Sequence, residues 1–136
     1  MRGDRFAREA WLRRYTHEAD GLPWPQQGHS DDGTIGCDSL GCIVRVADHA
    51  VAVTRRPEAI AEDCRNADIM LSLVPVTMPC QTPRAVIDRA ALWRQGAHAI
   101  WLSNGWAGRS RITVKSVNEL RGDRPWIVRP EPDSSG

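Results

Sequence analysis

Residues 34–54, TIGCDSLGCIVRVADHAVAVT, decide the predicted fold class. Runs of β-branched and apolar residues alternate there with two turn candidates, Asp38-Ser39-Leu40-Gly41 and Asp48-His49. Strands joined by such short turns pair in an antiparallel way, so the stretch is predicted to form a meander. The three predicted strands cover residues 34–37, 42–46 and 50–54.

A helix and a buried strand are predicted after the meander. Pro57 stands where a helix accepts proline most readily, and residues 58–66 follow with Ile60 and Cys64 on one face. Residues 68–74 form a continuous apolar run, which is typical of a strand buried on both faces.

The next elements complete an α/β pattern. A short strand is predicted at 84–87, and Asp88 is placed to cap a helix over 89–95. Residues 97–102 and 111–117 have the composition and alternation of two strands that pair as a hairpin. The sequence therefore predicts a layered α/β fold with a mixed sheet, antiparallel hairpins and two to three helices.

The chain length of 136 residues fits one domain. We expect an N-terminal helix over 1–16, a loop over 17–33, a single α/β domain over 34–128 and a flexible tail over 129–136. No apolar run approaches the roughly 18 to 20 residues of a membrane-spanning helix, and the N-terminus lacks the apolar core of a signal peptide. We therefore expect this polypeptide by itself to be soluble.

The charge balance does not indicate a strong nucleic-acid binder. The chain has 18 Lys and Arg against 17 Asp and Glu, a net charge of +1. A local basic patch remains an option because arginine matches phosphate geometry and an exposed tryptophan can stack on a base. A solvated charged surface and a loop-anchoring tryptophan are the alternatives. The candidate DNA contacts are Arg55, Arg56, Arg109, Arg111, Lys115 and Trp106.

Four cysteines are candidates for disulfide bonds: Cys37, Cys42, Cys64 and Cys80. Four cysteines allow three pairings, and the sequence alone does not choose among them. A bridge across the turn between Cys37 and Cys42 is favoured in an oxidising compartment, and Cys64 with Cys80 could form a second one. A zinc site completed by a nearby histidine and buried free thiols are the alternatives.

Catalytic motifs are missing from the sequence. It contains no phosphate loop, dinucleotide glycine pattern, nucleophile elbow or His-Glu-x-x-His motif. The four histidines are scattered, whereas a two-metal hydrolase needs a dense set of His and Asp side chains. We therefore expect no catalytic residue, cofactor or metal in this chain, and an enzyme is less favoured than a binding or structural module.

The tripeptide Arg121-Gly122-Asp123 is interpreted as structural. Arg121 and Asp123 are expected to flank a turn, Arg124 to follow it, and Trp126 to pack onto the sheet.

A series of short motifs, taken in their order along the chain, is similar to that of a known family. The motifs are Ala10-Trp11-Leu12, Cys37-Asp38-Ser39-Leu40-Gly41-Cys42, Val51-Ala52-Val53, Arg56-Pro57-Glu58-Ala59, Glu62-Asp63-Cys64, Ala67-Asp68-Ile69, Cys80, Val86-Ile87-Asp88-Arg89, Gly96-Ala97-His98-Ala99 and Gly122-Asp123-Arg124-Pro125-Trp126. This series, over about residues 5–127, resembles the C-terminal soluble region of the ComEC family of DNA-internalisation competence proteins, in its alphaproteobacterial form.

The resemblance implies part of a metallo-β-lactamase-like fold attached to an inner-membrane channel that imports transforming DNA. It implies a periplasmic location, which favours Cys37–Cys42 and Cys64–Cys80 as disulfides, with DNA and the rest of the channel as partners. The family's His-x-His-x-Asp-His motif has no counterpart here, so no catalytic residue is carried over. A non-catalytic DNA-binding accessory domain, part of a nuclease whose metal ligands lie elsewhere, and a structural or oligomerisation module are the three functions considered.

Overall fold

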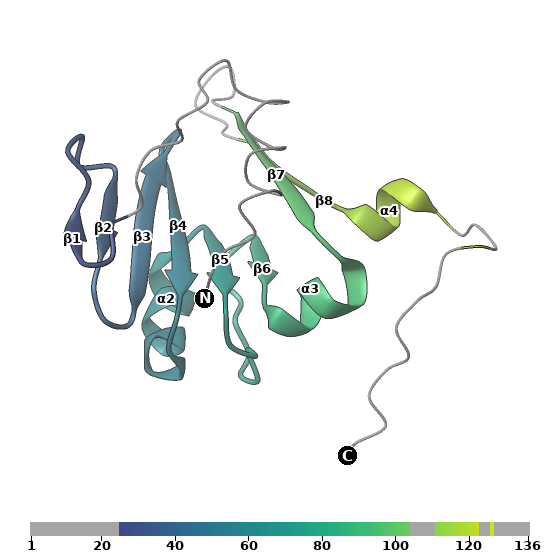
Figure 1. The fold of residues 1–136 in the computed structure, drawn as a ribbon, viewed down its shortest axis with the longest axis horizontal. Coiled ribbons are helices and arrows are strands. Elements are labelled where there is room, and N and C mark those ends of the chain that lie inside the picture. The colour runs from purple at the N-terminus through teal and green to yellow at the C-terminus, as the bar shows by residue number, and fades with distance from the viewer. Residues whose placement is uncertain (1–24, 104–110, 123–125, 127–136) are drawn as a thin grey trace.

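The computed structural model describes residues 25–103, 111–122 and 126. In this part of the chain a six-stranded sheet, here the main sheet, has the strand order β1-β2-β3-β4-β5-β6, and β7 and β8 form a separate two-stranded ribbon (Figure 1). The strands are β1 (Gly28–His29), β2 (Ile35–Cys37), β3 (Gly41–Val46), β4 (His49–Thr54), β5 (Ile69–Ser72), β6 (Ala85–Ile87), β7 (His98–Ser103) and β8 (Arg111–Ser116). The helices are η1 (Pro57–Ala59), α2 (Ile60–Asn66), α3 (Arg89–Gln95) and α4 (Val117–Arg121).

Strands β2 to β4 form the three-stranded antiparallel meander that the sequence predicts, and β1 pairs with β2 at its edge. The Asp38 carboxylate accepts the backbone N–H groups of Leu40 and Gly41, which fixes the β2–β3 turn. The β3–β4 turn lies one residue earlier than predicted, because Ala47 and Asp48 hold its two positive φ angles of 51° and 61°. Such angles suit the twist of a two-residue hairpin, so His49 already belongs to β4.

The other half of the main sheet is parallel. Strand β4 pairs in parallel with β5, and β5 pairs in parallel with β6. Such connections require a crossover, and α2 supplies the one between β4 and β5. Helix α2 turns Ile60 and Cys64 inward, as its spacing predicts. The predicted α/β fold with a mixed sheet is therefore confirmed.

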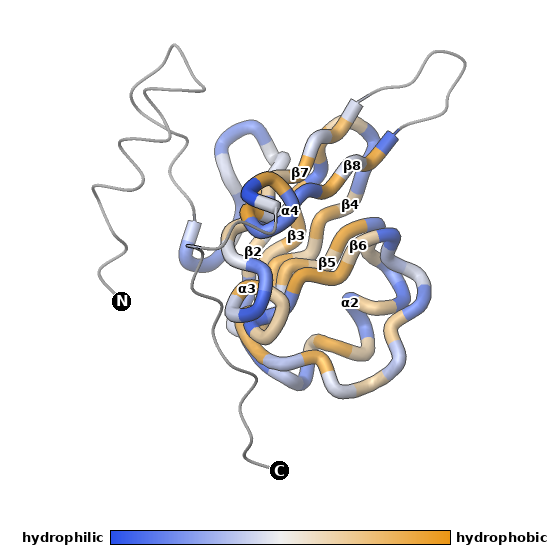
Figure 2. The backbone as a smooth tube through the Cα atoms, turned by 90° about the vertical axis from the view of Figure 1, so that its right-hand side faces the viewer, coloured by the Kyte–Doolittle hydropathy of each residue, from blue (hydrophilic) through white to orange (hydrophobic). Residues whose placement is uncertain are grey.

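The core lies along the central strands. Ala52 in β4 and Ile69 and Met70 in β5 are completely buried. The hydrophobic stretches of the tube in Figure 2 gather in the same strands of the main sheet. Many hydrophilic residues lie in the loops around this apolar centre, as expected because loop backbone groups must stay hydrated.

Helix α3 leads from β6 to the ribbon, as Figure 1 shows. Asp88 caps α3 by accepting the backbone N–H of Ala91 at 2.7 Å, and Gly96 ends it with a φ of 76°. Strands β7 and β8 pair as predicted, although outside the main sheet.

Helix α4 corrects the sequence interpretation at one point. Val117 begins this helix instead of ending a strand, and Arg121 is its last residue, followed by Gly122. The cause is a capping box in which Ser116 accepts the Glu119 backbone N–H and the Glu119 side chain accepts the Ser116 backbone N–H.

Strand β1 corrects another prediction, because it lies inside the expected loop over 17–33 and pairs with β2. The predicted helix over 1–16 and the tail over 129–136 lie outside the described residues. Among the helices of the described part, none has the length and apolar character needed to cross a bilayer.

Candidate nucleic-acid interface

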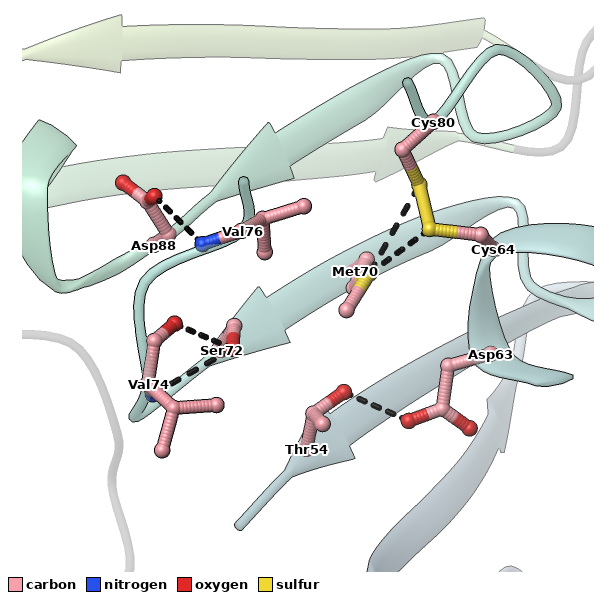
Figure 3. Close-up of a disulfide and its surroundings, with 9 residues drawn as sticks. All are labelled: Thr54, Asp63, Cys64, Met70, Ser72, Val74, Val76, Cys80 and Asp88. Atoms are coloured by element: carbon pink, nitrogen blue, oxygen red, sulfur yellow. Dashed lines mark hydrogen bonds between the residues drawn. A yellow bond between two sulfur atoms is a disulfide. The ribbon is translucent and has the colours of Figure 1, made fainter. Parts of the chain in front are cut away.

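The carboxyl ends of the parallel strands are the first place to look for a site, because ligands of α/β sheets bind at that edge. Thr54 ends β4, Ser72 ends β5 and Asp88 follows β6. Thr54 and Ser72 are buried, with 0% and 2% exposure. Figure 3 shows all three side chains at this edge.

Each of these side chains has a structural partner (Figure 3). The Thr54 hydroxyl donates to Asp63 of α2 at 2.5 Å. The Ser72 hydroxyl donates to the Val74 carbonyl at 2.6 Å. Asp88 accepts the backbone N–H of Val76 at 3.0 Å in addition to capping α3. The edge therefore uses its polar groups to hold α2, the segment after β5 and α3 in place.

The carboxylates of this region titrate according to their surroundings. Burial raises the pKa of Asp63, and the neighbouring charges of Glu62 and Asp38 add to this, against the lowering effect of the Thr54 hydrogen bond. At Asp88 burial also acts to raise the pKa, but the backbone N–H groups it accepts, with Arg94, outweigh burial and lower the pKa. The described residues contain no group of three His, Cys, Asp or Glu side chains placed to hold a metal ion.

Both expected disulfides are present. Cys37 and Cys42 are register partners across β2 and β3, with Cα atoms 4.0 Å apart, and their sulfurs are bonded. Cys64 of α2 is bonded to Cys80 in the irregular segment between β5 and β6. The zinc and free-thiol alternatives are therefore wrong for this structure, since every cysteine is paired.

A groove of about 730 Å³ lies between the first strands of the main sheet and α2. Its lining includes the acidic side chains of Asp38, Glu62 and Asp63, with Arg45 and His29. Three carboxylates against one arginine make this groove a poor site for a polyanion.

The near-neutral total charge hides a separation along the chain. Residues 25–83 contain four arginines against eight Asp and Glu, a net charge of −4. The described residues after them, 84–103 and 111–122, contain six Arg and Lys against two acidic residues, a net charge of +4. The ribbon, α3 and α4 therefore form the positive part of the described chain, and a polyanion would be drawn to them.

One face of the ribbon combines positive charge with an exposed aromatic ring. In β8 the side chains of Arg111, Thr113 and Lys115 share a face because successive strand residues alternate. Register places Ser103, Trp101 and Ala99 of β7 directly opposite them. We call this set of six residues the ribbon face. The opposite side carries half-buried apolar residues, namely Ile100, Leu102, Ile112 and Val114.

Trp101 lies at the centre of the ribbon face and is 53% exposed. Its direct partner is Thr113, and its diagonal neighbours are Arg111 and Lys115, positions within reach of long side chains. Arg111 and Lys115 lie four residues apart in β8, which separates their Cα atoms by about 13 Å. Both side chains are exposed.

A carboxylate also lies near the end of the ribbon face. Backbone N–H donation from Ser116 lowers the pKa of Glu119, and Lys115 adds to this effect. The Glu119 side chain accepts the Ser116 backbone N–H in the capping box, so its role is to stabilise the start of α4.

The structure brings only some of the predicted DNA contacts together. Arg111 and Lys115 share the ribbon face, whereas Arg55 and Arg56 follow β4 of the main sheet. The Arg55 guanidinium is half-buried and donates to the Gln26 carbonyl at 3.3 Å. The predicted residues Trp106, Arg109, Asp123 and Arg124 lie outside the described residues. Trp126, expected to pack onto the sheet, is 73% exposed.

Trp101 is the functional candidate that the sequence interpretation missed. The sequence predicts a strand at Trp101 and a loop at Trp106, and the loop position favours Trp106 as the exposed ring. The signal was the alternation in β7, where Ile100 and Leu102 define an apolar side and Trp101 falls on the other.

Comparison of the chain with protein-family models, curated proteins and solved structures gives no match.

Proposed function

We propose that this chain is a non-catalytic accessory domain of a ComEC-like inner-membrane channel that takes up DNA during natural transformation, and that the ribbon face contacts the DNA. The single observation that carries the binding proposal is the exposed Trp101 with Arg111 and Lys115 as its diagonal neighbours. The ordered series of sequence motifs supports the channel parentage.

The proposed contact works through stacking and charge. The Trp101 ring would stack on one base, an interaction worth about 1–3 kcal/mol. Arg111 and Lys115 would each approach a phosphate on either side of that base and release its counterions. Two phosphate contacts and one stacked base give weak binding, which suits a strand that must move on through a channel.

The location and the lack of catalysis rest on separate observations. Two disulfides suit the oxidising periplasmic side of the membrane. The polar side chains at the carboxyl edge of the parallel strands are used for local hydrogen bonds. Both fit a domain that handles DNA and is joined to the rest of the channel.

Fluorescence anisotropy with labelled single-stranded and double-stranded DNA at two salt concentrations tests the proposal. The titration is run in EDTA and repeated with Mn²⁺ or Zn²⁺. We expect weak binding that decreases with salt and leaves the DNA intact. Metal-dependent cleavage would indicate a nuclease instead, and no binding at low salt would indicate a structural module.

A further inference from the structure

Three sulfur atoms from three separate parts of the fold lie close together between α2 and the main sheet. Cys64 belongs to α2, Met70 to β5, and Cys80 to the segment between β5 and β6. The Met70 Sδ lies 3.7 Å from the Cys64 Sγ and 3.8 Å from the Cys80 Sγ. Figure 3 shows the thioether pointing at both ends of the disulfide.

Hydrogen bonding does not explain this arrangement. Both cysteine sulfurs are in the disulfide, so neither carries a proton to donate. Packing alone does not require a sulfur atom here, because leucine has a similar volume and usually replaces methionine at small cost. The distinctive feature is that a thioether is equally close to two potential thiolates.

The spacing matches a three-coordinate metal site. Metal–thiolate bonds of about 2.3 Å arranged in a triangle separate the sulfur ligands by about 4 Å. Met70 already lies at nearly that distance from both cysteine sulfurs. Opening the disulfide would let the two cysteine sulfurs separate and complete the triangle.

The surroundings favour a soft, poorly hydrated ion. Met70 is completely buried and Cys64 is 6% exposed. The apolar side chains packed around them are Ile60, Val74, Val76 and Val86. Thiolate and thioether ligands select Cu(I) over hard cations, and a dry apolar shell strengthens that selection. Cys80 is only half-buried, so it offers the side from which an ion would enter.

We propose that Cys64, Met70 and Cys80 form a Cu(I) site that the disulfide keeps closed and that reduction opens. A dithiol reductant gives two electrons and two protons to the disulfide and becomes a disulfide itself. Cu(I) then displaces the two thiol protons and binds two thiolates and the Met70 thioether, with no change in its oxidation state. This site is separate from the ribbon face and does not depend on the proposed function.

The test uses the full chain with Cys37→Ala and Cys42→Ala, so that Cys64 and Cys80 are its only cysteines. A phosphine reduces the remaining disulfide, taking up one oxygen atom from water as its oxide forms, and is removed anaerobically. Cu(I) is then titrated in competition with a coloured Cu(I) chelator. Matched variants are Met70→Leu and Met78→Leu, since Met78 is exposed in the same segment as Cys80.

The reduced chain is expected to bind one Cu(I) with three sulfur neighbours by X-ray absorption and to release two protons. The oxidised chain should bind none. Met70→Leu should weaken binding about tenfold or more, while Met78→Leu should leave it unchanged. Equal affinity in Met70→Leu, two sulfur neighbours, or loss of the near-ultraviolet circular dichroism on reduction would each overturn the proposal.

Discussion

Trp101 and Thr113 are direct partners across the ribbon, and the Trp101 side chain remains 53% exposed. Exposure alone does not distinguish this ring, because Trp93 and Trp126 are 68% and 73% exposed. What distinguishes Trp101 is its place on the ribbon face, diagonal to Arg111 and Lys115. Its position between two cationic neighbours makes stacking on a base the explanation that we favour.

The salt dependence of DNA binding should report the two cations of the ribbon face. Arg111→Gln and Lys115→Gln should each reduce the slope of log K against log salt for single-stranded DNA by about 0.7, because each removes one phosphate contact. Anisotropy titrations at four salt concentrations measure this slope.

Arg65→Gln is the matched control for that series, since Arg65 is an exposed arginine on α2. It should leave the slope unchanged. A slope that changes as much in the control as in Arg111→Gln would mean that charge acts diffusely and not at the ribbon face.

The two disulfides should contribute unequally to stability. Cys37–Cys42 closes a separation of 5 residues, and Cys64–Cys80 closes one of 16. In the chain-entropy treatment their removal costs about 2 and about 3 kcal/mol, respectively. Urea unfolding of the two double cysteine-to-alanine variants measures both costs, and a larger loss for the Cys37–Cys42 pair would contradict this ranking.

Asp63→Asn should stabilise the chain at neutral pH. Burial raises the pKa of Asp63, so its charged form is disfavoured in the folded state and stability falls as pH rises through the folded pKa. Asparagine keeps an acceptor for Thr54 and carries no charge. Thermal unfolding from pH 3 to pH 8 should show that the melting temperature of the variant rises relative to that of the parent as pH increases. A difference in melting temperature that stays constant with pH would contradict this explanation.

Asp88→Ala should destabilise the chain by about 1–2 kcal/mol at neutral pH, because the α3 cap is lost together with the acceptor for Val76. The folded pKa of Asp88 is depressed, so its ionised form stabilises above the ordinary value of 3.8 and the benefit is lost as pH falls through the folded pKa.

Asp88→Asn is the conservative partner of that variant, because its single amide oxygen still accepts one backbone N–H. The two carboxylate oxygens of Asp88 accept the N–H groups of Ala91 and Val76 separately, so the asparagine NH2 would face the other N–H without an acceptor. Asp88→Asn should therefore recover only part of the stability lost in Asp88→Ala, and full recovery would show that one of the two hydrogen bonds contributes nothing.

Local patterns predicted much of the fold. Alternation and turn residues located β2, β3 and β4, and Asp88 with Gly96 marked the ends of α3. Two errors have local causes. Ala47 adopts a positive φ, which alanine rarely does, so the β3–β4 turn begins one residue earlier than predicted. At Val117 the Ser116–Glu119 capping box starts a helix where the alternation predicted the end of a strand.

The candidate site was only half predictable, for a physical reason. Arg111 and Lys115 were recognisable as cations, but their shared face depends on the register that pairs Trp101 with Thr113. Register between strands is a property of the folded hairpin, so spacing within one strand cannot reveal which cross-strand side chains meet.

The most direct test of the account is the single-stranded DNA affinity of Trp101→Ala at low salt, compared with Trp93→Ala. Trp93 is a 68% exposed tryptophan on α3, outside the ribbon face. Loss of one stacked base predicts that Trp101→Ala weakens binding about 5-fold to 150-fold, while Trp93→Ala binds as the parent does. Equal affinity of Trp101→Ala and the parent chain would contradict the assignment of the ribbon face as the DNA contact.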